Sequence, residues 1–469
     1  MTSGIVSYGA YLPYWRLDRA ALGAFLGAPG GRGTRSVASY DEDSTSMGVE
    51  AARLALAAAD GAVPSALYFA TTSPPYLDKN NASALHAALD LPDSAFAVDM
   101  LGSVRSAVGV LRAAADATGP TLAVLSDVRA GLPGGADERD GGDGAAAFLF
   151  GSGDGVLAEQ AATASVTGEF LDRWRLPGDD HSQVWEERFG EHMYAPLAEQ
   201  AFASALKAAD VTVSDVDRLI VTGQSARAAR TVARQSGVAP EALADDLSSV
   251  VGNTGAAHPG LMLAALLDQA SAGQLLAVVV LADGVDVLLL RTTEAVQRFR
   301  PAVTVARQVA ARVDVDYGRY LTWRGMLRRD PPRRPAPDRP GAPPSARHES
   351  WKYAFVGSRC LECGERHQPP QRVCHRCHAV DRMQRERLAD TSATLATYSV
   401  DWLAYSPSPP VVLGVVDFEG GGRLQCELTD VDPASIAIGD RLQMTFRRLF
   451  TAGGVHNYFW KARPVRKVD

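Results

Sequence analysis

The N-terminal part of the chain alternates short apolar runs with longer, alanine-rich runs. The apolar runs are rich in Val and Leu, as is typical of strands buried on both faces, and the alanine-rich runs have helical periodicity. Strands are predicted at Leu67–Thr71, Thr121–Ser126, Leu219–Thr222 and Leu275–Leu281, and helices at Ser46–Ala59, Ser103–Thr118 and Gly260–Ala272. This alternation predicts an α/β body.

The order of these elements repeats along the body. In the first half a strand ends at Thr72, a glycine-led helix follows from Gly102, and the next strand ends at Asp127. The matching points of the second half are Gly223, Gly255 and Gly284. Two copies of one α/β unit explain this order, so we predict two similar halves at residues 1–160 and 161–300.

A Pro/Arg-rich run follows the body. Residues 328–347 read RRDPPRRPAPDRPGAPPSAR, which has nothing apolar to bury and too many prolines for a helix or a central strand. We therefore predict a helical segment and a linker within 301–350. The linker is either a stiff, solvated spacer or a partner-binding segment.

Beyond the linker, apolar and polar residues alternate as they do in antiparallel strands. Such runs occur at Thr394–Leu403, Pro410–Phe418, Arg423–Leu428 and Arg441–Arg448. Together with a closing strand, they predict a five-stranded OB-type β-barrel at 386–469. Residues 351–385 are left for a separate small element.

The overall composition excludes several classes of protein. The 469 residues exceed the ~100–200 of one domain, and 46% hydrophobic and 22% charged residues are close to globular averages. A formal charge of −7 leaves no overall basic field for nucleic acid or an anionic membrane. No apolar stretch reaches the length of a membrane span, and the N-terminus lacks the order of a signal peptide. We therefore expect a soluble cytoplasmic protein.

The cysteines indicate a metal site. Cys360, Cys363, Cys374 and Cys377 form two CxxC pairs, whereas Cys426 stands alone. Four thiolates at this spacing fit tetrahedral Zn²⁺ and leave no open position for a catalytic water, so we predict a structural zinc ribbon at 351–385. A redox pair is the alternative, although one CxxC would suffice for that chemistry.

Two polar features near these elements are given structural interpretations. Three histidines, His367, His375 and His378, are surplus to a four-cysteine site, and we expect them to be solvated loop residues. The acidic, glycine-rich run Gly131–Gly144 does not have the spacing of an EF-hand, so we expect a mobile, solvated loop instead of a calcium site.

Several segments of the body resemble one family. They are GIVSYGAYLPYWRL at the N-terminus, DEDSTSMGVEAARLAL (Asp41–Leu56), DRWRLPG (Asp172–Gly178), VVGNTGAAHPGLMLAALLD (Val250–Asp268) and LADGVDVLLL (Leu281–Leu290). In this order they resemble 3-hydroxy-3-methylglutaryl-CoA synthase, especially its archaeal form, within the thiolase superfamily. The resemblance implies a five-layered α-β-α-β-α body of two similar halves that is usually dimeric.

The C-terminal part has a resemblance of its own. The segment GSRCLECGERHQPPQRVCHRC (Gly357–Cys377) and the residues after it resemble the zinc-ribbon/OB-fold proteins that accompany thiolases and synthases of this superfamily. Together the two resemblances cover nearly the whole chain except the linker.

The family's nucleophile is not matched by a cysteine. Such synthases use a cysteine at a helix N-terminus to accept an acyl group from a CoA thioester. All five cysteines of this chain lie beyond the linker, and the matching position falls on Ser103, or on Gly102 if the register slips by one. Ser103 is either a nucleophile without a base beside it in sequence, or a helix N-cap or pocket-lining residue.

The other family positions also differ. The resemblance places Thr72 at the family's acid/base glutamate, Thr222 at its histidine and Asn253 at its asparagine. A threonine cannot shuttle a proton near neutral pH, so Claisen condensation through an acyl-cysteine is improbable on chemical grounds. Asn253 either holds a thioester carbonyl or stabilises its turn.

Other side chains near these positions are candidates for chemistry. His258, next to Pro259, is either catalytic or a hydrogen-bonded structural residue. Tyr76 and Asp78 follow Thr72, with loop packing and a solvated carboxylate as their structural interpretations.

Two further groups of residues offer binding chemistry. Arg227, Arg230 and Arg234 recur at helical spacing and either bind the phosphates of CoA or form a solvated face. The segment Val455–Pro464 holds four ring side chains that either stack on an adenine or nucleic-acid base, or pack in the barrel core. They are His456, Tyr458, Phe459 and Trp460.

Two functions remain open. The first is an acyl-CoA carbon–carbon lyase or acyltransferase-like enzyme, performing an aldol or retro-aldol step without an acyl-cysteine. The second is a catalytically silent acyl-CoA-binding subunit that docks an active thiolase through its zinc-ribbon/OB module. A homodimer is expected from the resemblance, and membrane or nucleic-acid partners are not. An unrelated binding role through the OB module is the remaining alternative.

Overall fold

The computed structural model describes residues 3–59, 61–330, 332 and 334–466. The chain forms two compact units. The first, which we call the body, comprises Met1–Ala38, Asp43–Ser83 and Pro92–Tyr317. The second, the C-terminal unit, comprises Ser39–Glu42, Ala84–Leu91 and Gly318–Asp469.

The body is built on one nine-stranded sheet. In spatial order its strands are β11 (Arg218–Gly223), β12 (Leu275–Leu281), β13 (Gly284–Thr292), β8 (Ala158–Thr167), β1 (Ser3–Tyr11), β7 (Gly144–Ser152), β6 (Thr121–Asp127), β4 (Ala66–Thr71) and β5 (Phe96–Leu101). The four strands predicted in the body are all present, because their Val/Leu runs are buried from end to end or nearly so.

The two halves repeat one pairing pattern. In the first half β4 pairs parallel with β6, β6 antiparallel with β7, and β7 antiparallel with β1. In the second half β11 pairs parallel with β12, β12 antiparallel with β13, and β13 antiparallel with β8. The halves join where β8 pairs with β1 at Gly4 and Ile5. The predicted duplication is therefore confirmed.

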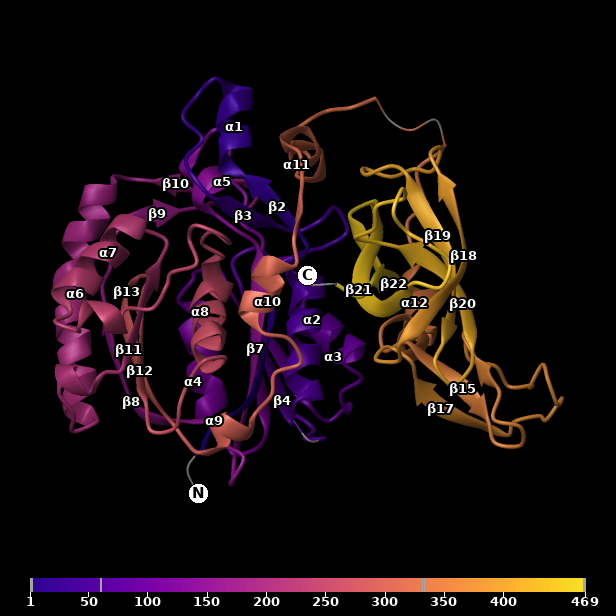
Figure 1. Ribbon diagram of the computed structural model, residues 1–469, viewed down its shortest axis with the longest axis horizontal. Coiled ribbons are helices and arrows are strands. Elements are labelled where there is room, and N and C mark those ends of the chain that lie inside the picture. The colour runs from indigo at the N-terminus through magenta and orange to yellow at the C-terminus, as the bar shows by residue number, and fades with distance from the viewer. Residues whose placement is uncertain (1–2, 60, 331, 333, 467–469) are drawn as a thin grey trace. The chain divides into compact units, whose positions relative to one another are not determined.

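Helices cover the sheet in three groups (Figure 1). The helices are α2 (Ser44–Ala57), α4 (Ser106–Ala115), α6 (Glu187–Ala208), α7 (Ala226–Gln235) and α8 (His258–Leu267). α2 packs on β1, β6 and β7, α6 and α7 pack on the second half, and α4 and α8 lie between the halves. The two halves of the sheet lie between these three groups of helices, which gives the predicted α-β-α-β-α layering.

Helix boundaries follow local capping. α2 begins at Ser44 because the Asp43 side chain accepts a hydrogen bond from the Ser46 backbone N–H at 2.9 Å. α4 begins three residues later than predicted, after Gly102 at φ +105° and a turn in which the Ser103 hydroxyl accepts the Arg105 backbone N–H at 3.2 Å. α8 begins at His258, with Pro259 in the first turn, where the missing N–H of proline costs nothing.

Smaller elements complete the body. They are β2 (Trp15–Asp18), α1 (Arg19–Leu26), β3 (Thr34–Val37), α3 (Ala82–Ala88), α5 (Ala136–Asp140), β9 (Arg173–Trp174), β10 (Gln183–Val184), α9 (Ala295–Arg298), α10 (Val305–Ala310), β14 (Val313–Asp314) and α11 (Tyr317–Trp323), of which α3 and α11 continue into the C-terminal unit.

The prediction of a solvated loop at Gly131–Gly144 is wrong. The segment contains helix α5, and the side chains of Glu138 and Asp143 are fully buried. Tyr317 donates to Glu138 at 3.0 Å, and the Ala38 backbone N–H donates to Asp143 at 2.7 Å. Both partners lie far from this segment in the sequence. The prediction of exposure relied on the acidic composition of the segment, which does not reveal such partners.

The C-terminal unit contains a ribbon and a barrel. The ribbon is a three-stranded sheet of β16 (Arg366–His367), β15 (Val356–Cys360) and β17 (Met383–Arg387). The barrel is closed by β18 (Ala393–Asp401), β19 (Val411–Phe418), β20 (Arg423–Leu428), β22 (Val455–Pro464) and β21 (Arg441–Ala452), in that spatial order. The prediction of a five-stranded OB-type barrel is confirmed.

A buried ionic network lies at one side of this barrel. Arg447 contacts Asp41 at 3.1 Å, Glu42 at 2.9 Å and Asp430 at 2.7 Å, and Lys461 contacts Asp41 at 3.0 Å. The side chains of Arg447, Lys461 and Asp41 have no exposed surface. The C-terminal unit therefore includes a short segment from early in the sequence, which the sequence pattern did not predict.

The linker differs from its prediction in one respect. Within the proline-rich run, Ala342–Arg347 forms the short helix α12, which is followed by α13 (Glu349–Lys352). Two prolines, Pro343 and Pro344, occupy the first turn of α12, where no intrahelical N–H donor is needed. The prediction that this run forms no helix is therefore wrong for its last six residues. Among the described residues, no helix combines the length and apolar character needed to cross a membrane.

Candidate functional site

A buried carboxylate organises the loops at the ends of the body strands. Asp127, the last residue of β6, accepts hydrogen bonds from the hydroxyls of Thr71 at 2.9 Å, Thr72 at 2.8 Å and Ser73 at 3.0 Å. It also accepts the backbone N–H groups of Thr72 and Ala256, both at 2.7 Å. One carboxylate thus joins the loop after β4 to the turn before α8.

The turn before α8 requires glycine. Gly255 has φ +59°, and a Cβ atom there would lie 2.2 Å from Asp127 Oδ2. The Asn253 amide donates to the Gly223 carbonyl at 2.8 Å and accepts from the Gly255 N–H at 3.0 Å. Asn253 therefore ties this turn to the end of β11.

We expect Asp127→Ala to destabilise the body by at least about 2 kcal/mol, because it leaves several buried hydrogen-bond donors without an acceptor. Urea unfolding followed by far-UV circular dichroism measures this. Asp154→Ala, at an exposed aspartate of the same body, is the control and is expected to change stability by less than about 0.5 kcal/mol. Equal effects of the two substitutions would contradict the role given to Asp127.

His258 is enclosed at the start of α8. Its side chain is 3% exposed, and its Nδ1 atom accepts the Thr254 backbone N–H at 3.3 Å. Burial lowers the pKa of His258 to about 4, although the charge of the Asp246 carboxylate and a hydrogen bond to the Asp246 backbone act in the opposite direction. The imidazole is therefore neutral near pH 7 and bound to its own loop.

The other predicted positions fall into two environments. Thr72 and Thr222, at the ends of β4 and β11, are buried, and the Thr72 hydroxyl is taken by Asp127. Tyr76 is half-buried and Asp78 is exposed on the loop that leads to α3. Thr71, Thr72 and Asn253 thus belong to one hydrogen-bonded frame. Within the described residues, neither Tyr76 nor Asp78 makes a hydrogen bond to Asp127.

Ser103 has a partner that lies far away in sequence. Its hydroxyl donates a hydrogen bond to the carboxylate of Asp283, which stands 180 residues further along the chain. Asp283 lies in the turn between β12 and β13 and is exposed. The carboxylate that Ser103 meets thus comes from the second half of the body. The signal available was an aspartate at the strand end that corresponds to Asp127.

The turn that carries Asp283 is held from both sides. Arg105 donates to the Asp283 carbonyl and to the Asp286 carboxylate, both at 2.8 Å. The Gly168 backbone N–H also donates to the Asp283 carbonyl, at 3.4 Å. These contacts hold Asp283 at φ +49°, a left-handed conformation that aspartate tolerates better than most residues.

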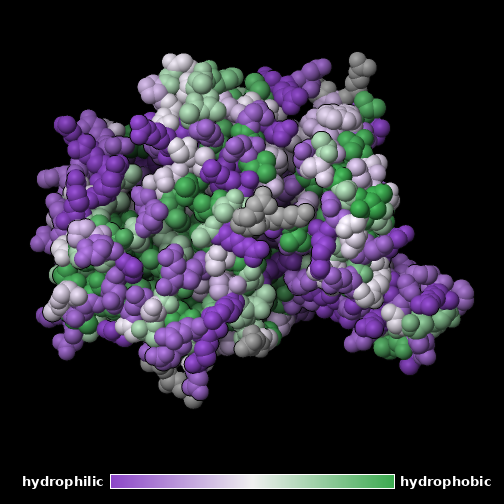
Figure 2. Space-filling model, in the orientation of Figure 1, coloured by the Kyte–Doolittle hydropathy of each residue, from purple (hydrophilic) through white to green (hydrophobic). Residues whose placement is uncertain are grey.

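The arginine row lies on α7. Arg227 pairs with Glu191 of α6, while Arg230 and Arg234 bond Ala226 and Thr231 on their own helix. All three arginines are exposed, and hydrophilic side chains cover much of the surface over α6 and α7 in Figure 2.

The predicted cysteine cluster is confirmed. The four sulfur atoms of Cys360, Cys363, Cys374 and Cys377 all lie within 4.8 Å of one another. The Sγ atoms of Cys360 and Cys377 are 3.6 Å apart, and those of Cys363 and Cys374 are 3.5 Å apart. A tetrahedral ion with Zn–S bonds of ~2.3 Å requires sulfur separations near these values, so the donor set fits zinc.

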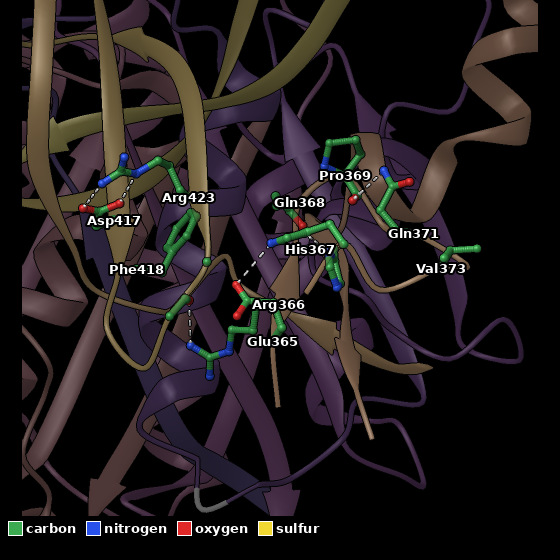
Figure 3. Close-up of a pocket in the computed structure, with 13 residues that line it drawn as sticks. Glu365, Arg366, His367, Gln368, Pro369, Gln371, Val373, Asp417, Phe418 and Arg423 are labelled. Carbon is green, nitrogen blue, oxygen red and sulfur yellow. Dashed lines mark hydrogen bonds and ion pairs between the residues drawn. The ribbon is translucent and has the colours of Figure 1, made fainter. Parts of the chain in front are cut away.

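A hollow of about 490 Å³ lies beside this cluster (Figure 3). Figure 3 shows Gln368, Pro369 and Gln371 of the ribbon on one side, and Asp417, Phe418 and Arg423 of the barrel on the other. Arg366, which also lines the hollow, connects the two sides. Arg366 binds Glu386 at 2.7 Å and the Glu419 carbonyl at 2.6 Å, which links ribbon to barrel.

The prediction of a solvated His367 is wrong. This side chain is 4% exposed, and its Nδ1 atom lies 2.9 Å from Nδ1 of His375. His367 comes after the first cysteine pair and lies in the short strand β16, where its ring is buried beside the second cysteine pair. His375 and His378 are exposed, as predicted.

The rings of the closing strand divide between core and surface. Trp460 and Tyr458 are buried, and the Trp460 indole donates to the Tyr353 carbonyl at 2.7 Å. Phe459 packs against Phe355, and His456 bonds the Thr451 hydroxyl at 2.7 Å. Core packing thus accounts for Tyr458 and Trp460.

Comparison with solved structures places the body in the thiolase fold. A structure of HMG-CoA synthase complexed with CoA aligns with a TM-score of 0.61 and 19% identity, covering 68% of this chain and 89% of that one. The 3-oxoacyl-(acyl carrier protein) synthase III of Pseudomonas aeruginosa aligns with a TM-score of 0.57 and 20% identity, covering 62% of this chain and 99% of that one.

Two family models match parts of the chain. The model of the C-terminal part of 3-oxoacyl-(acyl-carrier-protein) synthase III matches residues 206–288. The model of the ChsH2 C-terminal OB-fold domain matches residues 386–447. The protein is thus a thiolase-fold body joined to an OB-fold module.

Sequence relatives define the family. The hydroxymethylglutaryl-CoA synthase of Aeropyrum pernix is 30% identical over 343 residues, which cover 70% of this chain and 95% of the relative. The hydroxymethylglutaryl-CoA synthase of Methanopyrus kandleri is 29% identical over 343 residues, covering 69% of this chain and 98% of the relative. The chain belongs to the hydroxymethylglutaryl-CoA synthase family.

Proposed function

We propose that this protein makes or breaks a carbon–carbon bond on a CoA thioester by aldol or retro-aldol chemistry, without an acyl-cysteine intermediate. The proposal is carried by one observation. The body belongs to the synthase family and has an ordered loop frame around Asp127 and Asn253, but it contains no cysteine. Aldol chemistry requires an enolate and a proton carrier but no covalent acyl transfer.

Binding of a CoA thioester is supported by the structural neighbour that is complexed with CoA. On the body, the arginines of α7 are our candidates for the CoA phosphates. In the C-terminal unit, the four cysteines would hold a zinc ion in a structural role, because their four sulfur atoms would fill every tetrahedral position.

A homodimer is part of the proposal. β5 is an edge strand of the nine-stranded sheet, and its first residue, Phe96, is 59% exposed. An open strand edge offers unpaired backbone groups to a second copy of the same strand.

Mass spectrometry of the full-length protein with a panel of short, branched and steroid-sized acyl-CoA esters tests the proposal. We expect reversible complexes in native spectra, no acyl mass after denaturation, and conversion of a 3-hydroxyacyl-CoA into a shorter acyl-CoA and a carbonyl compound. An acyl mass that survives denaturation and is absent from Ser103→Ala would overturn the non-covalent mechanism.

A catalytically silent subunit that docks an active thiolase is the second candidate. It is favoured by the burial of Thr72 and His258, which leaves neither side chain accessible to substrate, and by the OB-fold module that resembles a domain of ChsH2. Stable co-purification with a thiolase, together with CoA ester binding but no turnover alone or in that complex, would support this candidate against the enzyme.

A further inference from the structure

The contact between Ser103 and Asp283 brings together a hydroxyl and a carboxylate from the two halves of the body. Ser103 donates to Oδ2 of Asp283. Among the described residues, no other side chain binds this carboxylate, and its Oδ1 atom accepts no hydrogen bond. One oxygen is therefore oriented by Ser103, while the other is available to a proton donor from outside.

The space beside this pair is open. Gly102 precedes Ser103 with φ +105°, and a Cβ atom there would meet nothing within 4 Å. Asp283 itself is exposed, although Arg105 and the Gly168 backbone N–H hold its carbonyl. A ligand can thus approach a carboxylate whose direction is set by the protein.

From this geometry we infer that Asp283 is the proton-transferring base of the site and that Ser103 is its positioning residue. The inference rests on the proposed function and names the side chain that carries the proton in it. In the aldol direction Asp283 Oδ1 takes a proton from the α-carbon of an acyl-CoA ester, and the bonding electron pair moves onto the thioester oxygen as an enolate.

The remaining step returns this proton. The enolate carbon forms a bond to the carbonyl carbon of an aldehyde or ketone, whose oxygen becomes an alkoxide and takes the proton from Asp283. In the reverse direction Asp283 removes the β-hydroxyl proton, the bond between the α- and β-carbons breaks, and the α-carbon is protonated. No oxidant, reductant or further reactant is consumed.

Hydrogen exchange at the α-carbon tests this base without knowledge of the second substrate. Full-length protein is incubated in D₂O with acetyl-CoA or propionyl-CoA, and deuterium in the acyl group is measured by mass spectrometry. We expect exchange by the wild type, a loss of about 100-fold or more in Asp283→Asn, and partial retention in Asp283→Glu. Asparagine also tolerates the left-handed conformation of this position, so Asp283→Asn keeps the turn.

Matched variants separate positioning from folding. Ser103→Ala is expected to lower exchange by about tenfold, and Ser103→Thr, which keeps the hydroxyl, to restore it to within about twofold. Asp154→Asn, an exposed aspartate of the same body, is expected to leave exchange unchanged. Far-UV circular dichroism and gel filtration verify that each variant is folded.

The outcomes separate the role of Asp283 from the proposed function. Wild-type exchange that Asp283→Asn does not reduce would overturn the role of Asp283 and leave the proposed aldol function standing. A wild type that exchanges neither ester would overturn the enolate chemistry itself, and this inference with it. A covalent acyl group on Ser103 would also overturn it, because Ser103 would then be a nucleophile.

Discussion

Asp41→Asn is expected to lower the free energy of unfolding of the C-terminal unit by about 3–5 kcal/mol. The carboxylate contacts Arg447 and Lys461, and neither cation has any exposed surface. Removing its charge leaves both cations with less compensation inside the protein. Urea unfolding followed by tryptophan fluorescence, to which the buried Trp460 contributes, measures the loss.

A surface pair on the same barrel supplies the control. Asp417 binds Arg423 at 2.6 Å, but both side chains are largely exposed. Asp417→Asn is therefore expected to cost only about 0.2–1 kcal/mol. Similar losses for Asp41→Asn and Asp417→Asn would show that burial of the network contributes nothing.

The same network sets an acid limit. Burial alone would raise the pKa of the Asp41 carboxyl, but the Lys461 ammonium and the Arg447 guanidinium outweigh it and hold that pKa below its usual value. Because the folded pKa lies below the unfolded value of about 3.9, the stabilisation is complete well above pH 4 and is lost as the pH falls further.

Removal of zinc is expected to unfold the ribbon. β15, β16 and β17 form a sheet of only twelve residues in total, too small to hold its shape without the four thiolates fixed on one ion. A chelator should release one zinc per chain, measured with a colorimetric zinc reagent, and should lower the midpoint of thermal unfolding. Cys374→Ser should abolish zinc retention.

Cys426→Ser is the matched control for zinc. Cys426 is a buried barrel residue that is not part of the cluster, and its replacement should leave the zinc content unchanged. Protein produced with ample zinc that nevertheless contains none would contradict the structural site, as would a Cys374→Ser variant that retains the ion.

The sequence predicted those parts of the fold that depend on local pattern. The strand Leu275–Leu281 has the predicted bounds because its unbroken apolar run is typical of a strand that is buried on both faces of the sheet. The cysteine cluster was predictable because two CxxC pairs at this spacing in the sequence are typical of a tetrahedral zinc site. Proline at the start of α12 misled the prediction, since the same residue ends some helices and begins others.

Side chains that depend on distant partners were not predictable. Glu138 and Asp143 are buried through contacts with Tyr317 and Ala38, and Asp283 meets Ser103 across the two halves. A pattern reports which residues are polar, but it does not report which of them will find a partner after folding.

The ionic network also sets an order of events during synthesis. Asp41 and Arg447 are separated by 406 positions in the chain. At 5–20 residues per second, a ribosome needs roughly 20 to 80 s to add the second partner after the first. Throughout this interval the Asp41 carboxylate lacks its buried partner, so the C-terminal unit completes its assembly only after Arg447 has been synthesised.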